Sequence, residues 1–485
     1  MTKKVLFLCG SPRGKKSASL TTARYMAQFL DYDYEFVNVA RARLSTNPTE
    51  AEPAFLEIVA KMQTADAVVW AFGAWVLSVS VKMQHLLDKL FTQSGFDFKG
   101  KIAAAILTSV RLRDDTTLER MRFVSEQLGF GYLGDVSAVG NPFFGYIDDV
   151  ETTEASCRVL AGQINRALGD GYVPAPLHPP VEHRYLSPAH HGAAFDVMGP
   201  AALKNGDKVI LVITGNRLAE DPANATIVEA VRRYSRNEVE VIALQDRKVG
   251  PCVGCYLCDF REEGICVVKD EYETIKQRMH EVDGLVYMGT CASYVVEPYL
   301  KAFLERTWGI SHRPTLKDKY GFVVATGGGP LEPDTARYLQ GVLSGYGIRC
   351  IAALTQSAAT PQNFAATLRR TIEDLDQAID EQWQIAERFS VRAKNRVFRD
   401  LVAESGMVLQ ADYKYFKEND LFDAPSPGGK NALWRLLFRN EGLKERLMTR
   451  GMARTVEARE KRLVAYLQNS QKLGMGKEIS SRDTL

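Results

Sequence analysis

The chain repeats itself, and this repeat limits its fold more than any other feature of the sequence. A short aliphatic run with a glycine-containing loop opens the chain as KKVLFLCGSPRG, and a similar run, DKVILVITGNRL, begins at Asp207. A longer pair, ADAVVWAFGAWVLSVSVKMQHLLDKLF from Ala65 and VDGLVYMGTCASYVVEPYLKAFLERTW from Val282, aligns without a gap. Two copies of one structural unit are therefore predicted.

Strand-like and helix-like runs alternate within each copy. In the first copy the apolar, β-branched runs predict strands near Lys4–Cys9, Tyr34–Asn38, Ala67–Ala71, Lys101–Thr108 and Val136–Val139. Residues at helical spacing separate them, at 20–30, 55–63, 79–90, 117–128 and 155–168. This alternation predicts an α/β fold, in which each copy forms a doubly wound parallel sheet with helices on both faces.

Composition shifts divide the chain into four expected regions. These are the first sheet domain at 1–170, a Pro- and His-rich linker at 171–206, the second sheet domain at 207–386 and a basic helical extension at 387–485. The extension has 20 Lys+Arg and 12 Asp+Glu from Arg388 onward. Its apolar residues between 434 and 447 lie near helical spacing, and we expect them to pack against the sheet domains. Contact with a membrane surface is the less favoured alternative.

Cysteine content and hydropathy limit the class of protein. Eight cysteines in 485 residues are too few for a secreted fold held together by disulfides. The N-terminal apolar run is interrupted before a signal-peptide core is reached, and no apolar run is long enough to cross a bilayer. We expect a cytoplasmic protein that has no nucleic-acid partner.

The loop after the first strand, CGSPRGKKSASLTTARY, has the residues of a phosphate site. Gly10 permits a tight turn, Ser11, Ser17 and Ser19 provide hydroxyls, and Arg13 provides a forked cation. The following helix would direct its positive N-terminus at the same place. Neither G-x-G-x-x-G nor G-x-x-x-x-G-K-[ST] is present, which disfavours a dinucleotide-binding domain and a P-loop NTPase. In the alternative reading, these residues only form a helix N-cap.

Four cysteines lie close together, with the spacing C-x2-C-x2-C-x7-C: Cys252, Cys255, Cys258 and Cys266. Structural zinc usually uses two separated C-x2-C pairs, and a second pair is missing here. A tight run of thiolates can instead surround an iron–sulfur cubane. Zinc and a metal-free or dithiol loop remain alternatives. The interval with the cysteines is 12 residues longer than its counterpart, because matching positions lie 205 residues apart at the first strand and 217 at the third.

Two motifs of the first copy resemble a known superfamily. GSPRGKKSAS and AFGAWVLSVSVKMQHLLDKL are similar to the phosphate loop and the second signature of the flavodoxin-like NAD(P)H-dependent FMN reductases and quinone reductases. The resemblance implies two flavodoxin-like domains in tandem and an FMN whose phosphate is held by the serines and Arg13. Five residues would face the ribityl chain and ring: Gly73, Ala74, Trp75, Val76 and Leu77.

Each copy also departs from the superfamily pattern. In the first, Gly73 replaces the usual proline, and the third flavin loop, TSVRLRDDTT, is not glycine-rich. In the second, the third loop has the expected Thr326, Gly327, Gly328 and Gly329, but the phosphate loop TGNRLAEDPANAT is stretched and acidic. We expect at least one FMN, in the first copy.

The cysteine motif resembles that of the iron–sulfur flavoproteins in both spacing and position. This resemblance implies a [4Fe–4S] cluster close to FMN, and an enzyme that passes electrons from NAD(P)H or a ferredoxin-like donor to a small organic or quinone-type acceptor. It also implies a homo-oligomer, and a redox partner protein is compatible with it. No catalytic acid or base is predicted. The alternatives are a non-enzymatic electron-transfer protein and a zinc-stabilised binding protein on a flavodoxin scaffold.

Overall fold

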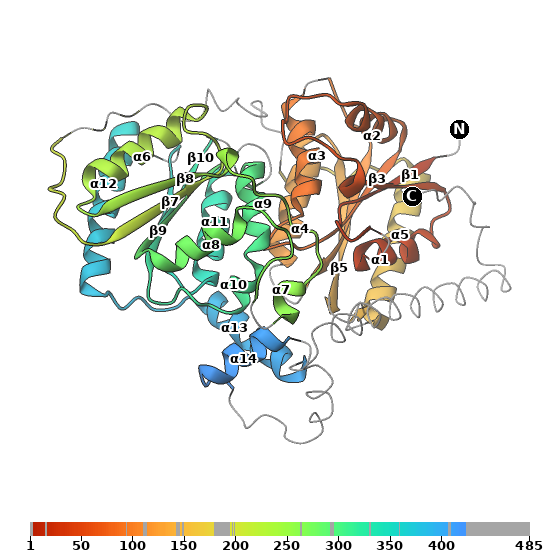
Figure 1. Cartoon of the computed structure of the whole chain (residues 1–485). Coiled ribbons are helices and arrows are strands. Elements are labelled where there is room, and N and C mark those ends of the chain that lie inside the picture. The colour runs from red at the N-terminus through yellow and green to blue at the C-terminus, as the bar shows by residue number, and fades with distance from the viewer. Residues whose placement is uncertain are drawn as a thin grey trace, which may run out of the picture. The chain divides into compact units, whose positions relative to one another are not determined.

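The structure is a computed structural model of the chain (Figure 1). It describes residues 3–14, 17–93, 95–109, 114–141, 146–147, 150–178, 195, 197, 199–261, 264–291, 295–328, 331–357, 359–405 and 409–422. These residues form two compact units. The first contains the described residues up to 178 together with Val253–Cys255, and the second contains the others from 195 onward.

The first unit is a sheet with the strand order β2-β1-β3-β4-β5-β6 (red to yellow in Figure 1). Its strands are β1 (Lys4–Cys9), β2 (Asp33–Asn38), β3 (Ala67–Gly73), β4 (Ile102–Ser109), β5 (Gly131–Asn141) and β6 (Tyr146–Ile147). Its helices are α1 (Ala18–Ala27), the 3-10 turn η2 (Val39–Arg41), α2 (Pro53–Thr64), α3 (Val81–Thr92), α4 (Asp114–Gln127) and α5 (Val150–Asp170). Strands β1 to β5 pair in parallel, and β6 pairs antiparallel with β5.

Both faces of this sheet are covered, which explains why its strands read as continuous apolar runs. Val5 and Phe7 of β1 belong to one core cluster with Leu20 of α1 and Ile164 of α5. On the other face, the Trp70 indole of β3 donates a hydrogen bond of 3.0 Å to the hydroxyl of a serine in α4. The chain reverses its direction of winding at β1, so the loops after β1 and β3 meet at one edge of the sheet.

The second unit repeats this architecture with the strand order β11-β10-β9-β7-β8, and all of these strands are parallel (green to blue in Figure 1). Its strands are β7 (Val209–Thr214), β8 (Glu238–Ala243), β9 (Gly284–Thr290), β10 (Tyr320–Thr326) and β11 (Arg349–Thr355). Its helices are α6 (Pro222–Tyr234), the 3-10 turn η4 (Leu244–Asp246), α7 (Leu257–Phe260), α8 (Tyr272–Glu281), α9 (Pro298–Arg306), α10 (Trp308–His312), α11 (Glu332–Gly345) and α12 (Pro361–Glu381). The predicted fold class is confirmed.

Two further helices, α13 (Phe389–Ser405) and α14 (Gln410–Glu418), follow the second sheet. They agree with a helical extension after residue 386. The apolar run at 434–447, for which packing or membrane contact was considered, lies outside the described residues. Among the described residues, no helix is long and apolar enough to span a membrane.

Candidate functional site

The phosphate loop of the first copy collects hydroxyls at the N-terminus of α1. Ser17 caps the helix by accepting a hydrogen bond from the Leu20 N–H, and its hydroxyl lies 2.8 Å from that of Ser19. Ser11 accepts a hydrogen bond from the Arg13 N–H. All three serines are buried, and the first turn of α1 has no acidic residue. Hydroxyls at an uncompensated helix N-terminus are suited to a phosphate.

Gly10 is required where β1 passes helix α3. A Cβ atom at this position would lie 2.8 Å from the Met83 side chain, so a larger residue would displace the helix. Ser80, the N-cap of α3, donates a hydrogen bond of 2.5 Å to the Gly10 carbonyl. The Gly10 N–H donates to the Ala71 carbonyl. The phosphate loop is thereby fixed to the segment that begins the second flavin motif.

The segment from Gly73 to Leu77 has a strained backbone. Val76 and Leu77 have φ values of +46° and +63°, which are unfavourable for side chains with a Cβ and most of all for a β-branched one. Backbone hydrogen bonds hold the turn, from Ala74 to the Thr108 carbonyl and from Trp75 to the Ser78 carbonyl. Such strain is concentrated at ligand sites. The segment lies at the edge of the sheet that the sequence predicts for the flavin ring.

In the second copy, an internal carboxylate occupies the corresponding position. Glu297 aligns with Ser80 and is fully buried. It accepts hydrogen bonds of 2.8 Å and 2.7 Å from the backbone N–H groups of Gly215 and Thr290. Gly215 corresponds to Gly10, so the N–H that begins the loop is bonded within the protein in both copies, to the Ala71 carbonyl in the first and to Glu297 in the second.

A second carboxylate caps helix α6. Asp221 is buried and accepts hydrogen bonds from the Asn224 N–H, the Asn216 amide and the Thr290 hydroxyl. It is the N-cap of α6, as Ser17 is of α1. A buried carboxylate at this end of the helix would repel a phosphate. The start of this helix is therefore less suited to an anion in the second copy than in the first.

Part of the predicted third flavin loop of the second copy forms hydrogen bonds within the protein. Thr326 is buried and its hydroxyl lies 3.2 Å from that of Thr290. Gly327 and Gly328 have φ values of +120° and +68°, and the Gly328 N–H donates to the Glu332 carboxylate. Gly329, also predicted to contact flavin, lies outside the described residues.

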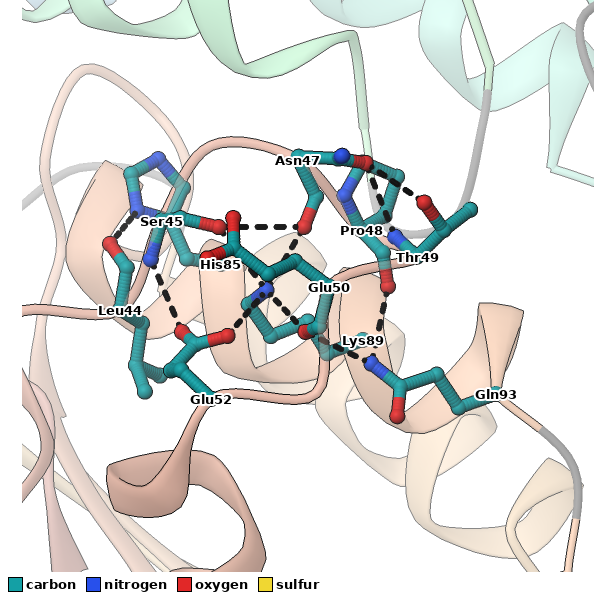
Figure 2. Close-up of polar contacts among 10 residues, drawn as sticks. All are labelled: Leu44, Ser45, Asn47, Pro48, Thr49, Glu50, Glu52, His85, Lys89 and Gln93. Atoms are coloured by element: carbon teal, nitrogen blue, oxygen red, sulfur yellow. Dashed lines mark hydrogen bonds and ion pairs between the residues drawn. The ribbon is translucent and has the colours of Figure 1, made fainter.

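A buried lysine holds the loop between η2 and α2 in the first copy (Figure 2). The Lys89 ammonium donates hydrogen bonds to the carbonyls of Asn47 and Glu50 at 2.6 Å and 2.7 Å and to the Ser45 hydroxyl at 3.2 Å. It also forms an ion pair with Glu52 at 2.9 Å. The side chain is completely buried, so the loop folds around a single cation.

An arginine has the same role in the second copy, and there the loop carries the cysteines. Arg306 aligns with this lysine. It donates hydrogen bonds to the carbonyls of Gly250 and Val268, at 3.2 Å and 3.1 Å, and forms an ion pair of 2.5 Å with Asp270. These partners lie just before and just after the four cysteines. The arginine therefore holds the two ends of the cysteine loop together.

The cysteine loop turns sharply around Cys255. Gly254 and Tyr256, on either side of Cys255, both have left-handed backbones with φ values of +68° and +59°. The short helix α7 then carries Cys258. The Cys266 N–H donates to the Glu273 carboxylate at 2.7 Å. Three-residue spacing with two left-handed positions lets the chain curve around one centre.

Cations surround three of these cysteines. Lys301 is completely buried, forms an ion pair of 3.0 Å with Glu305 and interacts more weakly with Cys252. Burial lowers the pKa of this lysine, and Glu305 and Cys252 oppose that shift. The other two cysteines, Cys258 and Cys266, have Arg313 and Arg306 as their charged neighbours. Nearby cations favour the thiolate form that metals bind.

The donor set is that of a thiolate-bound metal. Four cysteine thiols on one short segment, with cations beside three of them, suit zinc and an iron–sulfur cluster alike.

The sequence motifs did not reveal the cations and carboxylates that define these sites. Lys301, Arg306 and Arg313 lie on helices after β9, far along the chain from the thiols. The gapless alignment of the two copies contained a signal for two of them, because it pairs Lys89 with Arg306 and Gln84 with Lys301. The same alignment pairs Ser80 with Glu297.

Glu297 predicts how stability depends on pH. Burial raises the pKa of Glu297 to about 8, and the Asp221 charge adds to the rise. At pH values between 4.5, the pKa of Glu297 in the unfolded chain, and about 8, Glu297 is protonated in the folded state and ionised in the unfolded chain. Glu297 therefore makes the free energy of unfolding fall as pH rises from 5 to 8, by up to about 1 kcal/mol per unit. We expect Glu297→Gln to remove this slope in denaturant titrations.

Glu281→Gln is the matched control. Hydrogen bonds from Arg278 lower the pKa of the exposed Glu281, so its contribution is constant over the same pH range. Parallel pH profiles for wild type and Glu297→Gln would contradict the assignment.

Both halves of the chain match one family model, described as NADPH-dependent FMN reductase, at residues 3–142 and 209–357. The iron-sulfur flavoprotein of Archaeoglobus fulgidus is 27% identical over 192 residues, which cover 37% of this chain and 84% of that protein. The iron-sulfur flavoprotein of Methanocaldococcus jannaschii is 29% identical over 120 residues, which cover 24% of this chain and 61% of that protein.

Solved structures resemble parts of the chain. The NAD(P)H:quinone oxidoreductase from Methanothermobacter marburgensis has 17% identity and a TM-score of 0.27, and covers 35% of this chain and 98% of its own. The azoreductase from Bacillus anthracis has 16% identity and a TM-score of 0.26, with coverages of 34% and 99%. The family match covers more than half of the chain in two segments. The chain therefore belongs to the NADPH-dependent FMN reductase family, of which it contains two copies in tandem.

Proposed function

We propose that the protein is a flavin-dependent oxidoreductase that carries FMN in its first copy and a [4Fe–4S] cluster on the four cysteines of its second. Electrons enter from NAD(P)H or a ferredoxin-like donor and leave to a small organic or quinone-type acceptor. The names of the similar iron-sulfur flavoproteins support this combination of cofactors.

The observation that carries the proposal is the difference in polar side chains between equivalent positions of the two copies. The first copy has uncharged serines, Ser17 and Ser80, where the second has the buried carboxyl groups of Asp221 and Glu297. The second copy has instead a buried lysine, Lys301, where the first has a glutamine. One copy is thus suited to an anionic phosphate and the other to anionic thiolates.

Each residue has a physical task in this proposal. Ser11, Ser17, Ser19 and Arg13 bind the flavin phosphate, and the strained segment Gly73–Leu77 orients the ring. When bound, FMN accepts a hydride as an electron pair, and an iron–sulfur cluster passes electrons singly. The cations beside the cysteines stabilise the thiolate charge. A protein acid or base is not required for hydride transfer between nicotinamide and flavin.

We also propose a cytoplasmic, homo-oligomeric enzyme whose final acceptor is a small molecule. The rival role is an electron carrier that serves a partner protein. Steady-state oxidation of NAD(P)H with a quinone as acceptor separates the two roles, because a carrier would show almost no turnover.

Ser17 tests the flavin site. Removing its hydroxyl costs the helix cap about 1 kcal/mol of stability and also deprives the phosphate of a donor. We expect Ser17→Ala to weaken FMN binding about tenfold, measured by fluorescence titration of the apoprotein. Thr360→Ala removes a comparable N-cap, at α12, and should leave FMN binding unchanged. Equal FMN affinity in both variants would contradict the placement of the phosphate.

The cofactor content tests the whole proposal. Anaerobically purified protein should contain about one FMN, about four iron and about four sulfide per chain. Cys266→Ser should lose most of its iron and sulfide and keep its FMN, whereas Cys350→Ser, outside the motif, should keep both. A colourless protein that contains zinc, or a Cys266→Ser variant with full iron content, would refute the cluster.

A further inference from the structure

A second group of metal-ligating side chains lies buried in the second unit, separate from the cysteine thiols. It consists of Asp259 of α7, His312 of α10 and Asp412 of α14. The His312 Nδ1 lies 3.1 Å from an oxygen of Asp412 and 3.5 Å from an oxygen of Asp259. One ligand atom from each residue lies within 4.8 Å of the other two. The exposed fractions of these side chains are 0%, 2% and 0%.

The Asp259 carboxylate is poorly satisfied by the protein. Within the described part of the chain, neither of its oxygens accepts a hydrogen bond of ordinary geometry, and the Trp308 side chain interacts with it more weakly than the neighbouring charges do. Burying a carboxylate with so few donors is costly, so native structures usually place a positive charge or a metal beside it. The poorly satisfied oxygens are therefore an independent indication that the group binds something.

Arg313 does not meet this requirement by itself. Its guanidinium lies 2.5 Å from one oxygen of Asp412 and also donates to the Cys258 carbonyl at 3.2 Å. The distance from the guanidinium to Asp259 is 3.9 Å, too long for a hydrogen bond. The arginine thus orients Asp412 and leaves that residue's second oxygen directed at His312.

We propose that Asp259, His312 and Asp412 bind one divalent transition-metal cation. Ligand atoms about 2.1 Å from a metal lie about 3.0 Å apart in octahedral geometry and about 3.4 Å apart in tetrahedral geometry. The spacings of 3.1 Å and 3.5 Å agree with these values. Two carboxylates and an imidazole suit Mn²⁺, Fe²⁺ or Zn²⁺. Arg313 then acts as an outer partner that holds a ligating carboxylate in place.

The cation would connect an element outside the two sheets to the cysteine loop. Helix α14 packs against α7, and Asp412 and Asp259 face each other across this contact. Asp259 directly follows Cys258 in the sequence. A metal shared by the two helices would hold α7, and with it one cysteine, in a fixed position. The site itself does not depend on the flavin or on the identity of the cysteine-bound metal.

Manganese is the appropriate probe, because Mn²⁺ prefers oxygen and nitrogen ligands and competes poorly for thiolates. We would titrate the full chain, as purified, with Mn²⁺ and follow the electron paramagnetic resonance signal of the free ion. Wild type should remove about one Mn²⁺ per chain from solution, and Asp259→Asn should weaken this binding at least tenfold. The matched control is Asp88→Asn, because Asp88 is also a buried aspartate with an unpartnered oxygen but belongs to no group of three metal-ligating side chains among the described residues.

Thermal unfolding distinguishes lost binding from lost folding. Asparagine is close in size to aspartate, so without metal Asp259→Asn should unfold at or above the wild-type temperature. Excess Mn²⁺ should raise the unfolding temperature of wild type and Asp88→Asn by several degrees, and leave that of Asp259→Asn unchanged. The proposal is overturned if wild type binds no more Mn²⁺ than Asp259→Asn. In that case His312, Arg313 and the two aspartates form an ion-pair network without a metal.

Discussion

A buried cation at the end of one helix holds the loop after the second strand in each copy, and in the second copy this loop carries the four cysteines. Lys89 has this position in the first copy and Arg306 in the second. Removing one partner of a buried ion pair lowers the stability of a protein by about 3–5 kcal/mol. Each loop is therefore held firmly to its helix. The second loop could gain residues and cysteines because its two ends, Gly250 and Asp270, remained attached to Arg306.

The duplication allowed the two copies to diverge in charge while the scaffold stayed the same. Serines at the helix N-termini of the first copy leave backbone dipoles free to attract an anion. In the second copy, Asp221 caps the equivalent helix with the protein's own carboxylate, and the Glu297 carboxyl group accepts the Gly215 N–H. Lys301 and Arg306 provide positive charge on the side of the sheet occupied by the cysteine loop. Under the proposed function, these substitutions are what give related domains different cofactors.

Local patterns in the sequence predicted the strands, the helices between them and the cysteine spacing, because each depends on neighbouring residues. The contacts that define the sites are not local. The carboxylate of Glu297 binds an N–H 82 residues earlier, and Asp412 meets a histidine 100 residues away. The left-handed backbone at Val76 was equally unpredictable, since β-branched residues normally avoid it. Of these positions, the alignment of the copies indicated Glu297, opposite Ser80, and it did so without showing the partners of Glu297.

The central claim is that the two copies hold different cofactors, one flavin in the first copy and one cluster in the second. A reductive titration under anaerobic conditions tests it most directly, with visible absorbance recorded against added dithionite. The account predicts uptake of about three electrons per chain, two at the flavin and one at the cluster. An end point at about two electrons, from a flavin alone, would contradict it, as would one at about four or five, from a flavin in each copy without or with a cluster.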